Sequence, residues 1–156
     1  RTVASLVSGC GRRVWPVGRL DLDSEGLLLM TDDGELTHTL LHPSHRIEKE
    51  YLVWVTGDVD RALPVLSGPM ELDGAPLAPA QVKRGPESGA VSRLSIVIHQ
   101  GKNRQVRRMC AQAGLKVTRL KRIREGKLWL DRELKPGQWR PLTAEEVERL
   151  TGQHRI

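Results

Sequence analysis

The feature that most constrains the fold is a continuous apolar run at residues 27–30, bounded by turn-forming residues on both sides. Gly26 precedes the run, and Asp32-Asp33-Gly34 follows it closely. A short, uninterrupted apolar stretch between turn signals is typical of a strand that is covered on both faces. We therefore expect a fully buried strand at this position.

An acidic loop leads into this strand. Asp21, Asp23 and Glu25 stand within five residues, and Arg19 comes just before them. Polar clusters usually lie in solvated loops, and composition alone favours that interpretation. A loop that enters a buried strand is held by a rigid scaffold, however, as catalytic side chains usually are. The position of these acids makes them candidates for a functional site.

The segment from Gly18 to Gly34 resembles the signature of ribosomal pseudouridine synthases of the RsuA/RluB-like branch. Residues 18–21 match its GRLD motif, and residues 24–34 match its TEGLLLLTNDG motif. Ser24 stands in place of threonine and Asp32 in place of asparagine, and both retain hydrogen-bonding ability. The resemblance implies that Asp21 is the catalytic aspartate.

A strand and an aliphatic position add to the resemblance. Residues 48–56 alternate and are rich in β-forming residues, which predicts a strand with Tyr51, Val53 and Val55 on one face. A lone tyrosine on such a face usually belongs to the core. Residues 49–51 also match the family's K-x-Y motif, which implies that Tyr51 lines the active site. Leu120 matches an aliphatic position of the family's base pocket.

A helix is expected between Asn103, as its N-cap, and Gly114, which ends it. Its apolar positions share one face and are Val106, Met109, Cys110 and Ala113. Arg107 lies at the border of this face, so its guanidinium can reach a cleft while its stem packs on the core. Residues 100–109 resemble the family's EGRNRQVRRM motif, which implies that Arg107 is the active-site arginine.

The remaining elements follow from periodicity and turn signals. Helices are predicted at residues 2–8, 34–41, 58–67 and 144–150, the last opened by a capping box of Thr143 and Glu146. Strands are predicted at residues 80–84, 93–100, 117–124 and 127–130, with a hairpin loop at residues 85–89. The fold class is therefore α+β: a mixed, mainly antiparallel central sheet flanked by helices. The resemblance implies the pseudouridine synthase fold with an RNA-binding cleft.

The net charge of +6 is concentrated in one segment. Residues 101–124 hold nine of the 25 Lys and Arg residues and no acid, which leaves 16 basic residues against all 19 acids elsewhere. Such a segment is typical of a surface that binds a nucleic-acid backbone, and it lacks the apolar face of a membrane-surface helix. The residues expected to contact RNA are Arg19, Lys102, Arg104, Arg108, Arg119, Lys121 and Arg122.

The histidines and cysteines do not indicate a metal site. His38 and His42 are four residues apart, but no HExxH glutamate follows His38, and Pro43 ends the helix. Cys10 and Cys110 are isolated thiols, which favour a reducing compartment over disulfides or zinc. No apolar run is long enough for a membrane span. We expect no metal, no cofactor, no membrane contact and a cytoplasmic location.

The resemblance implies an enzyme that isomerises a specific uridine of ribosomal RNA to pseudouridine. The glycosidic bond is broken and the base is rejoined through C5, which needs one carboxylate, as nucleophile or as base, and no redox cofactor. We expect Asp21 to act with Tyr51 and Arg107, on ribosomal RNA or a ribosome-assembly intermediate, in a monomer. Family members begin with an S4-like domain and a strand carrying a KPxG-type motif. Neither is found here, so we interpret residues 1–156 as one N-terminally truncated catalytic domain.

Two other classes of protein fit part of the sequence. An RNA-binding ribosome-assembly protein with an inert cleft explains the basic segment, but it leaves Asp21, Tyr51 and Arg107 without a role. A glycoside hydrolase that uses Asp21 and Glu25 is expected to carry aromatic residues that stack on sugars, whereas this chain has no Phe and one Tyr. Mapping of pseudouridine in treated RNA separates the first class from the isomerase.

Overall fold

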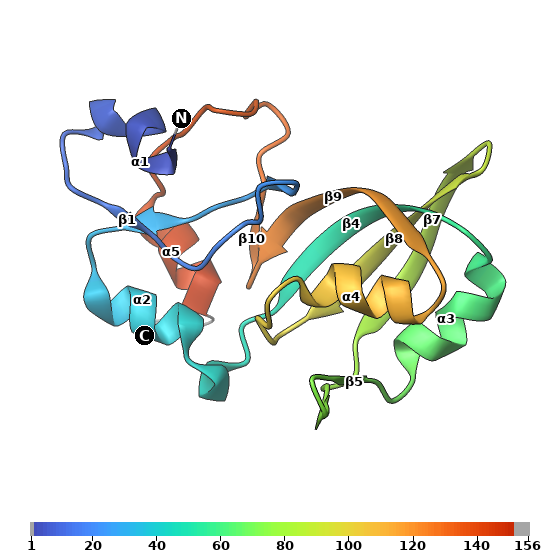
Figure 1. The fold of residues 1–156 in the computed structure, drawn as a ribbon. Coiled ribbons are helices and arrows are strands. Elements are labelled where there is room, and N and C mark those ends of the chain that lie inside the picture. Colours follow the sequence, from blue (N-terminus) through green and yellow to red (C-terminus); the bar gives the residue numbers. More distant parts are fainter. Residues whose placement is uncertain (1, 152–156) are drawn as a thin grey trace.

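A mixed, mainly antiparallel sheet forms the centre of the computed structural model, which describes residues 2–151 (Figure 1). Its main path runs β10 (Leu128–Trp129), β9 (Lys116–Glu125), β4 (Lys49–Thr56), β8 (Val91–Ile98) and β7 (Gln81–Ser88). All of these neighbours are antiparallel, and the short β2 (Glu25–Gly26) pairs with β9 in parallel. The expected α+β class is confirmed.

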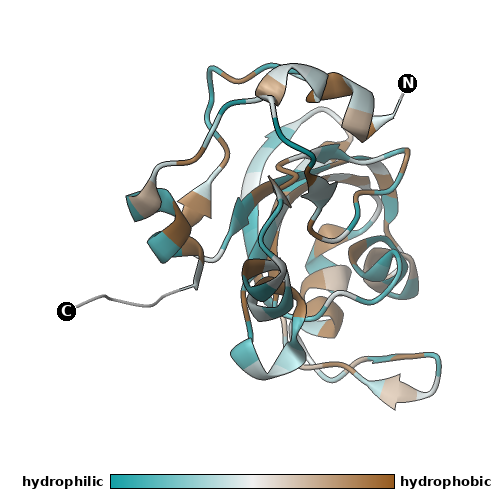
Figure 2. Cartoon of the chain, turned by 90° about the vertical axis from the view of Figure 1, so that its left-hand side faces the viewer, coloured by the Kyte–Doolittle hydropathy of each residue, from teal (hydrophilic) through white to brown (hydrophobic). Residues whose placement is uncertain are grey.

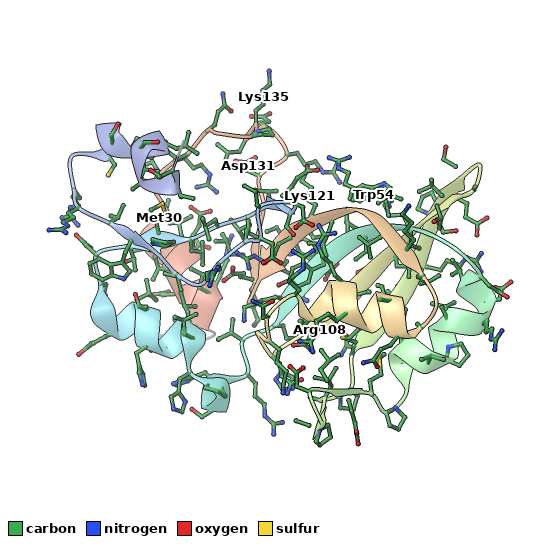
Figure 3. The ribbon with its side chains drawn as sticks, viewed as in Figure 1. Met30, Trp54, Arg108, Lys121, Asp131 and Lys135 are labelled. Atoms are coloured by element: carbon green, nitrogen blue, oxygen red, sulfur yellow. The ribbon has the colours of Figure 1, made fainter. Side chains whose placement is uncertain are left out.

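The alternation of the strands decides which face of the sheet is covered. Along β4, Val53 and Val55 are fully buried, whereas Trp54 between them is only partly covered. Trp54 and Lys121 of β9 lie on the side of the sheet away from Arg108 and its helix (Figure 3). Colouring by hydropathy shows the same mixture of apolar and polar residues along each helix and strand (Figure 2). The long central strands β4 and β8 and the helices that cover them therefore present one apolar side to the core.

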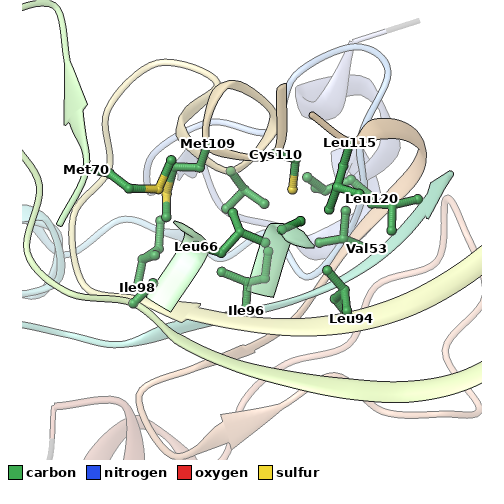
Figure 4. Packing of buried hydrophobic residues seen from close by; sticks show 14 of the residues in the cluster. Val53, Leu66, Met70, Leu94, Ile96, Ile98, Met109, Cys110, Leu115 and Leu120 are labelled. Carbon is green, nitrogen blue, oxygen red and sulfur yellow. The ribbon is translucent and has the colours of Figure 1, made fainter. Parts of the chain in front are cut away.

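Two helices cover the apolar face of the sheet. They are α3 (Val59–Ser67) and α4 (Gln105–Gln112). Leu66 from α3, and Met109 and Cys110 from α4, pack on Leu94 and Ile96 of β8 (Figure 4). These side chains have almost no exposed area, so this cluster is the main core.

The start of α4 differs from the expectation. The N-cap position is Arg104, in the left-handed conformation with φ 51°, and its side chain makes no capping hydrogen bond. Asn103 is therefore not the cap. The first turn is tied instead by the Gln105 side chain, whose Oε1 accepts from the Lys102 backbone N–H at 3.2 Å. The expected apolar face and the end of the helix at Gly114, with φ 83°, are confirmed.

A second, smaller core lies beside the sheet. It is formed by Val17, Leu29, Leu40, Ile47, Leu128 and Leu150. These residues come from α2 (Gly34–Leu41), α5 (Ala144–Thr151), β10, the segments around β1 (Trp15–Pro16) and β3 (Met30–Thr31), and the segment before β4. The predicted helices α2 and α5 are confirmed, and Thr143 and Glu146 form the expected capping box, with reciprocal hydrogen bonds of 3.0 and 3.2 Å.

The apolar run at residues 27–30 is not one buried strand, contrary to the expectation. Among its four residues only Leu29 is buried, and the run leaves β2 and enters β3 without ladder pairing in between. The Leu27 N–H donates to the Arg122 carbonyl at 2.8 Å, whereas the Leu29 carbonyl accepts from Val17 at 2.8 Å. The run thus passes from the central sheet to the small β1–β3 ribbon, and a single strand cannot serve both.

The hairpin between β7 and β8 is also longer than predicted. The expected loop at residues 85–89 is paired as far as Ser88, and the turn lies at Gly89 and the residue after it. A register shift between Arg84 and Glu87 accommodates Gly85 and Pro86, because a bulge tolerates a missing donor and a missing side chain.

The remaining short elements lie at the edges of the fold. They are α1 (Val3–Leu6), the 3-10 turns Ser8–Cys10 and Pro43–His45, and the hairpin of β5 (Glu71–Leu72) and β6 (Ala75–Pro76). Within residues 2–151, no helix is both long and apolar enough to cross a membrane. The same residues contain no group of three or more His, Cys, Asp or Glu side chains placed to hold a metal ion.

Candidate active site

A cleft of about 320 Å³ opens where the two cores meet. One wall is the loop that contains Arg19, Asp21 and Ser24, and the other is the segment from residue 98 to residue 107. The floor is contributed by the paired strands β4 and β9, through Lys49, Tyr51, Leu120, Arg122 and Glu125. The cleft thus joins segments that are far apart in the sequence.

Asp21 lies on the loop wall with 29% of its side chain exposed. The Asp21 carbonyl accepts from the Ser24 N–H at 2.9 Å, which closes the loop into a turn. Its carboxylate is 3.6 Å from Nη1 of Arg104, an ion pair without a hydrogen bond. The carboxylate is therefore held near a cation while it remains accessible from the cleft.

Arg107 holds the same loop, two and three residues beyond Asp21. Its Nη2 donates to the Asp23 carbonyl at 2.6 Å and to the Ser24 hydroxyl at 3.2 Å, and only 14% of its side chain is exposed. The carboxylate paired with Arg107 is that of Asp23, at 3.6 Å from Nε. Arg107 thus lies in the cleft as expected, but it contacts the backbone of the Asp21 loop and not the Asp21 carboxylate.

Arg104 was expected to contact RNA, and the structure places it against the acidic loop. It donates from both terminal nitrogens to the two carboxylate oxygens of Asp23, each at 2.9 Å. These hydrogen bonds hold the pKa of Asp23 at about 2, against an ordinary value of 3.8, while desolvation opposes the shift. Arg104, at the N-cap of α4, and Arg107, in its first turn, therefore both hold the loop.

Tyr51 extends the buried row of β4 to the cleft floor, where its side chain is partly buried. Burial raises the pKa of its hydroxyl; Arg122 opposes this shift, and the carboxylates of Glu125 and Asp21 add to it. The Tyr51 hydroxyl is therefore surrounded by charged groups from β9 and from the Asp21 loop.

Two charged residues of the cleft floor, Glu125 and Lys49, were not among the expected site residues. Glu125 forms an ion pair with Arg122 at 3.1 Å, with 3% and 4% of the two side chains exposed, and Lys49 lies nearby. Burial raises the pKa of Glu125 and lowers the pKa of Lys49, while each charge partly offsets the shift of the other. Arg122, expected on the RNA-facing surface, is buried. The sequence contained a signal for this burial, because Arg122 is two residues from Leu120 and therefore lies on the same face of the strand.

The other residues expected to bind RNA are spread over both faces of the sheet. Arg19 and Lys102 line the cleft, as does Leu120 from the main core. Arg119 makes two hydrogen bonds to Glu25, at 2.7 and 2.9 Å, and stacks on Trp54 with 4.4 Å from its carbon to the ring centroid. Arg108 pairs with Asp73 at 2.5 Å.

Lys102 and Lys121 remain available for a ligand, because no ion pair within residues 2–151 involves either of them. Lys102 is on the cleft wall, and Lys121 lies on the opposite side of the sheet with Trp54 (Figure 3). The basic segment is therefore not one continuous stripe in space.

Comparison with known proteins gives consistent matches. A family model described as RNA pseudouridylate synthase matches residues 8–112. An uncharacterized RNA pseudouridine synthase of Aquifex aeolicus (strain VF5) is 38% identical over 151 residues, which are 96% of this chain and 60% of that protein. Ribosomal large subunit pseudouridine synthase B of Vibrio cholerae is 42% identical over 142 residues, 90% of this chain and 44% of that protein. This chain thus spans only about half the length of such relatives.

A relative of similar length and two solved structures extend these matches. Ribosomal large subunit pseudouridine synthase E of Xanthomonas campestris pv. campestris is 42% identical, covering 90% of this chain and 82% of that protein. A crystal structure of pseudouridylate synthase superposes with a TM-score of 0.80 at 33% identity, covering 96% of this chain and 65% of that one. A Cbf5-Nop10-Gar1 complex gives a TM-score of 0.61 at 18% identity over 83% of this chain and 45% of that one, which reflects the fold alone.

Proposed function

Because the chain belongs to the RNA pseudouridylate synthase family, we propose that it isomerises a uridine of ribosomal RNA to pseudouridine, with Asp21 as the catalytic carboxylate. The N1–C1′ bond breaks and a C5–C1′ bond forms, while C5 loses a proton and N1 gains one. Atoms and electrons balance without a cofactor. Ribosomal RNA is supported as the substrate class by the names of two relatives, both ribosomal large subunit pseudouridine synthases.

The observation that carries this proposal is the position of Asp21. Its carboxylate is accessible on the wall of a cleft whose floor holds Tyr51, and Arg104 and Arg107 fix its loop from one helix. A carboxylate can attack C1′ directly, or it can act as a base that gives a transient glycal. Either route requires a fixed carboxylate near the sugar, and the held, accessible position of Asp21 supports this role.

The remaining cleft residues fit the handling of an extruded base. A uridine must leave its stack to reach the cleft, which costs a few kcal/mol. Arg19 on the loop wall is placed to occupy the vacated space or to hold a phosphate. The raised pKa of Tyr51 keeps its hydroxyl protonated near neutral pH, which favours packing on the base or hydrogen-bond donation over action as a base.

Glu25 does not fit the glycoside hydrolase alternative. Its carboxylate is engaged by Arg119 beside Trp54, away from the cleft, so it does not form a catalytic pair with Asp21. The partner we propose is ribosomal RNA or a ribosome-assembly intermediate. We also propose that the protein is a monomer and that it acts in the cytoplasm.

The substitution Asp21→Asn is expected to abolish isomerisation and leave the fold intact, because it removes one charge from a partly exposed loop. The measurement maps pseudouridine in treated ribosomal RNA with a pseudouridine-specific chemical adduct. Asp32→Asn is the matched control, since Asp32 pairs with Arg12 outside the cleft. Turnover by Asp21→Asn above a few per cent of wild type would refute the assignment. A wild-type chain that binds RNA without modifying it would favour the assembly protein.

A further inference from the structure

A buried ion pair lies under the cleft and has no role in the proposed reaction so far. Arg122 and Glu125 of β9 are almost completely covered, and their Nε and Oε1 atoms are 3.1 Å apart. Burying two charges in a protein interior usually costs more than their mutual attraction returns, and an apolar pair of similar volume is often as stable. The fold therefore gains little stability from this pair.

Arg122 connects the two ends of the loop that carries Asp21. Its Nε donates to the Leu27 carbonyl at 2.9 Å, and its Nη1 donates to the Arg19 carbonyl at 3.5 Å. The Arg122 carbonyl in turn accepts from the Leu27 N–H at 2.8 Å. One guanidinium thus contacts the backbone on both sides of Asp21.

Two polar atoms of the pair are left without hydrogen bonds. Within the described residues, Nη2 of Arg122 and Oε1 of Glu125 are buried and have no hydrogen-bond partner. Because the Arg122 Nε–H is directed to Leu27, it does not satisfy Glu125. An incompletely satisfied pair is costly, so its retention calls for an explanation other than stability.

We propose that Arg122, held by Glu125, is a positioning residue: it fixes both ends of the Asp21 loop and sets the electrostatic environment of the Tyr51 hydroxyl. The charged groups that act on that hydroxyl are Arg122 and Glu125 from β9 and Asp21 from the loop, and Lys49 from β4 lines the same cleft beside the Arg122–Glu125 pair. Arg122 and Glu125 belong to the cleft floor but are almost completely covered, so the role assigned to them acts through Asp21 and Tyr51. The inference rests on the proposed function for its catalytic consequence, but not for the arrangement itself.

The arrangement is tested by titrating Tyr51, which is the single tyrosine of the chain, by tyrosinate absorbance. Glu125→Gln is expected to lower the pKa of Tyr51, because the Glu125 carboxylate raises it in the folded protein. Arg122→Met is expected to raise the pKa further, because the guanidinium lowers it. Glu87→Gln is the matched control, since Arg84 and Glu87 form an Arg–Glu pair of the same spacing on the exposed β7. Titrations of the Glu125 and Arg122 variants that coincide with wild type would overturn the proposal.

The catalytic consequence is tested with Arg122→Lys and Glu125→Gln in single-turnover assays. Lysine keeps the charge but cannot reach both carbonyls, so we expect the rate constant to fall about a hundredfold with RNA affinity unchanged. Wild-type rates in both variants would overturn the positioning role. If wild type itself forms no pseudouridine, the proposed function fails, while the Tyr51 titration still decides the arrangement. If Arg122→Met does not fold, as shown by circular dichroism, the near-isosteric Glu125→Gln carries the titration.

Discussion

Arg107 donates from one guanidinium nitrogen to two groups of the loop beyond Asp21, the Asp23 carbonyl and the Ser24 hydroxyl. This nitrogen carries two N–H groups and can therefore donate to both acceptors at once, and the low exposure of Arg107 shows that its side chain is packed in place. At this scale, the position of the Asp21 carboxylate, which we propose to be catalytic, depends on a side chain that does not touch it.

Arg107→Lys is therefore expected to reduce the single-turnover rate about ten- to a hundredfold, because a lysine cannot reproduce both contacts and the loop shifts. The free energy of unfolding should change much less. Arg149→Lys, on the exposed face of α5 where Arg149 pairs with Glu145, serves as the control and should react at the wild-type rate. An unimpaired Arg107→Lys variant would mean that Ser24 and Asp23 hold the loop without this arginine.

Asp23 makes the free energy of unfolding depend on pH in the acidic range. Because the pKa of Asp23 is lowered to about 2 by its hydrogen bonds with Arg104, the stabilisation is complete above the ordinary value of 3.8 and is lost as the pH falls towards 2. Urea unfolding between pH 5 and pH 2 should show a shallower loss of stability for Asp23→Asn than for wild type. Arg104→Gln should likewise remove the part of the pH dependence that comes from the pairing of Asp23 with Arg104. Wild-type acid dependence in both variants would show that the pair does not persist in solution.

At the level of elements, the contact of β2 with β9 holds the Asp21 loop against the sheet. Gly26 has φ +117°, and a Cβ at this position would lie 2.2 Å from the Arg122 carbonyl oxygen. Only glycine combines this backbone conformation with such a close approach. The two-residue strand β2 is therefore stabilised by the absence of a side chain.

Gly26→Ala should lower the free energy of unfolding by more than about 2 kcal/mol, through backbone strain and the clash with β9. Gly89→Ala is the matched control, because Gly89 also has a positive φ (+60°) but its Cβ would meet nothing within 4 Å. The control should cost only about 1–2 kcal/mol, from the left-handed conformation alone. Equal losses in urea unfolding would mean that the β2–β9 contact adds nothing.

At the level of the whole molecule, folding largely neutralises the basic segment. Six of its nine cations pair with acids, and most of these acids lie far away in the sequence: Arg104 and Arg107 with Asp23, Arg108 with Asp73, Arg119 with Glu25, Arg122 with Glu125, and Arg124 with Glu48 and Glu50. The charge excess in the sequence therefore overstates the charge offered to RNA.

Substituting both Lys102 and Lys121 by Ala should weaken binding to any RNA and reduce the slope of log K against log salt by about 0.7 per lysine, since each phosphate contact releases counterions. Lys135→Ala, in the loop before α5 and outside the cleft lining, is the control and should keep the wild-type slope. Fluorescence anisotropy with a labelled ribosomal RNA fragment between 50 and 200 mM salt, the range over which phosphate contacts are usually resolved, measures both quantities. An unchanged slope would place the RNA path elsewhere.

Local patterns in the sequence were sufficient for most elements and for the residues that approach the cleft. Amphipathic periodicity located α2, β4, β8 and the apolar face of α4, because the inward or outward direction of a side chain depends on neighbours three, four or two positions away. The motif resemblance, and not periodicity, brought Asp21, Tyr51 and Arg107 together, and all three line the cleft. Whether they perform the chemistry remains for the mutants to test.

The tertiary structure alone decided which group each charged side chain meets. The partner of Arg107 is Asp23 rather than Asp21, Arg122 faces a buried Glu125 rather than solvent, and the run at residues 27–30 divides between two sheets. Alternation along β9 could show that Arg122 points inward, but not that the loop 100 residues earlier in the chain offers it carbonyl oxygens. Partners of this kind depend on long-range packing, which no local pattern in the sequence encodes.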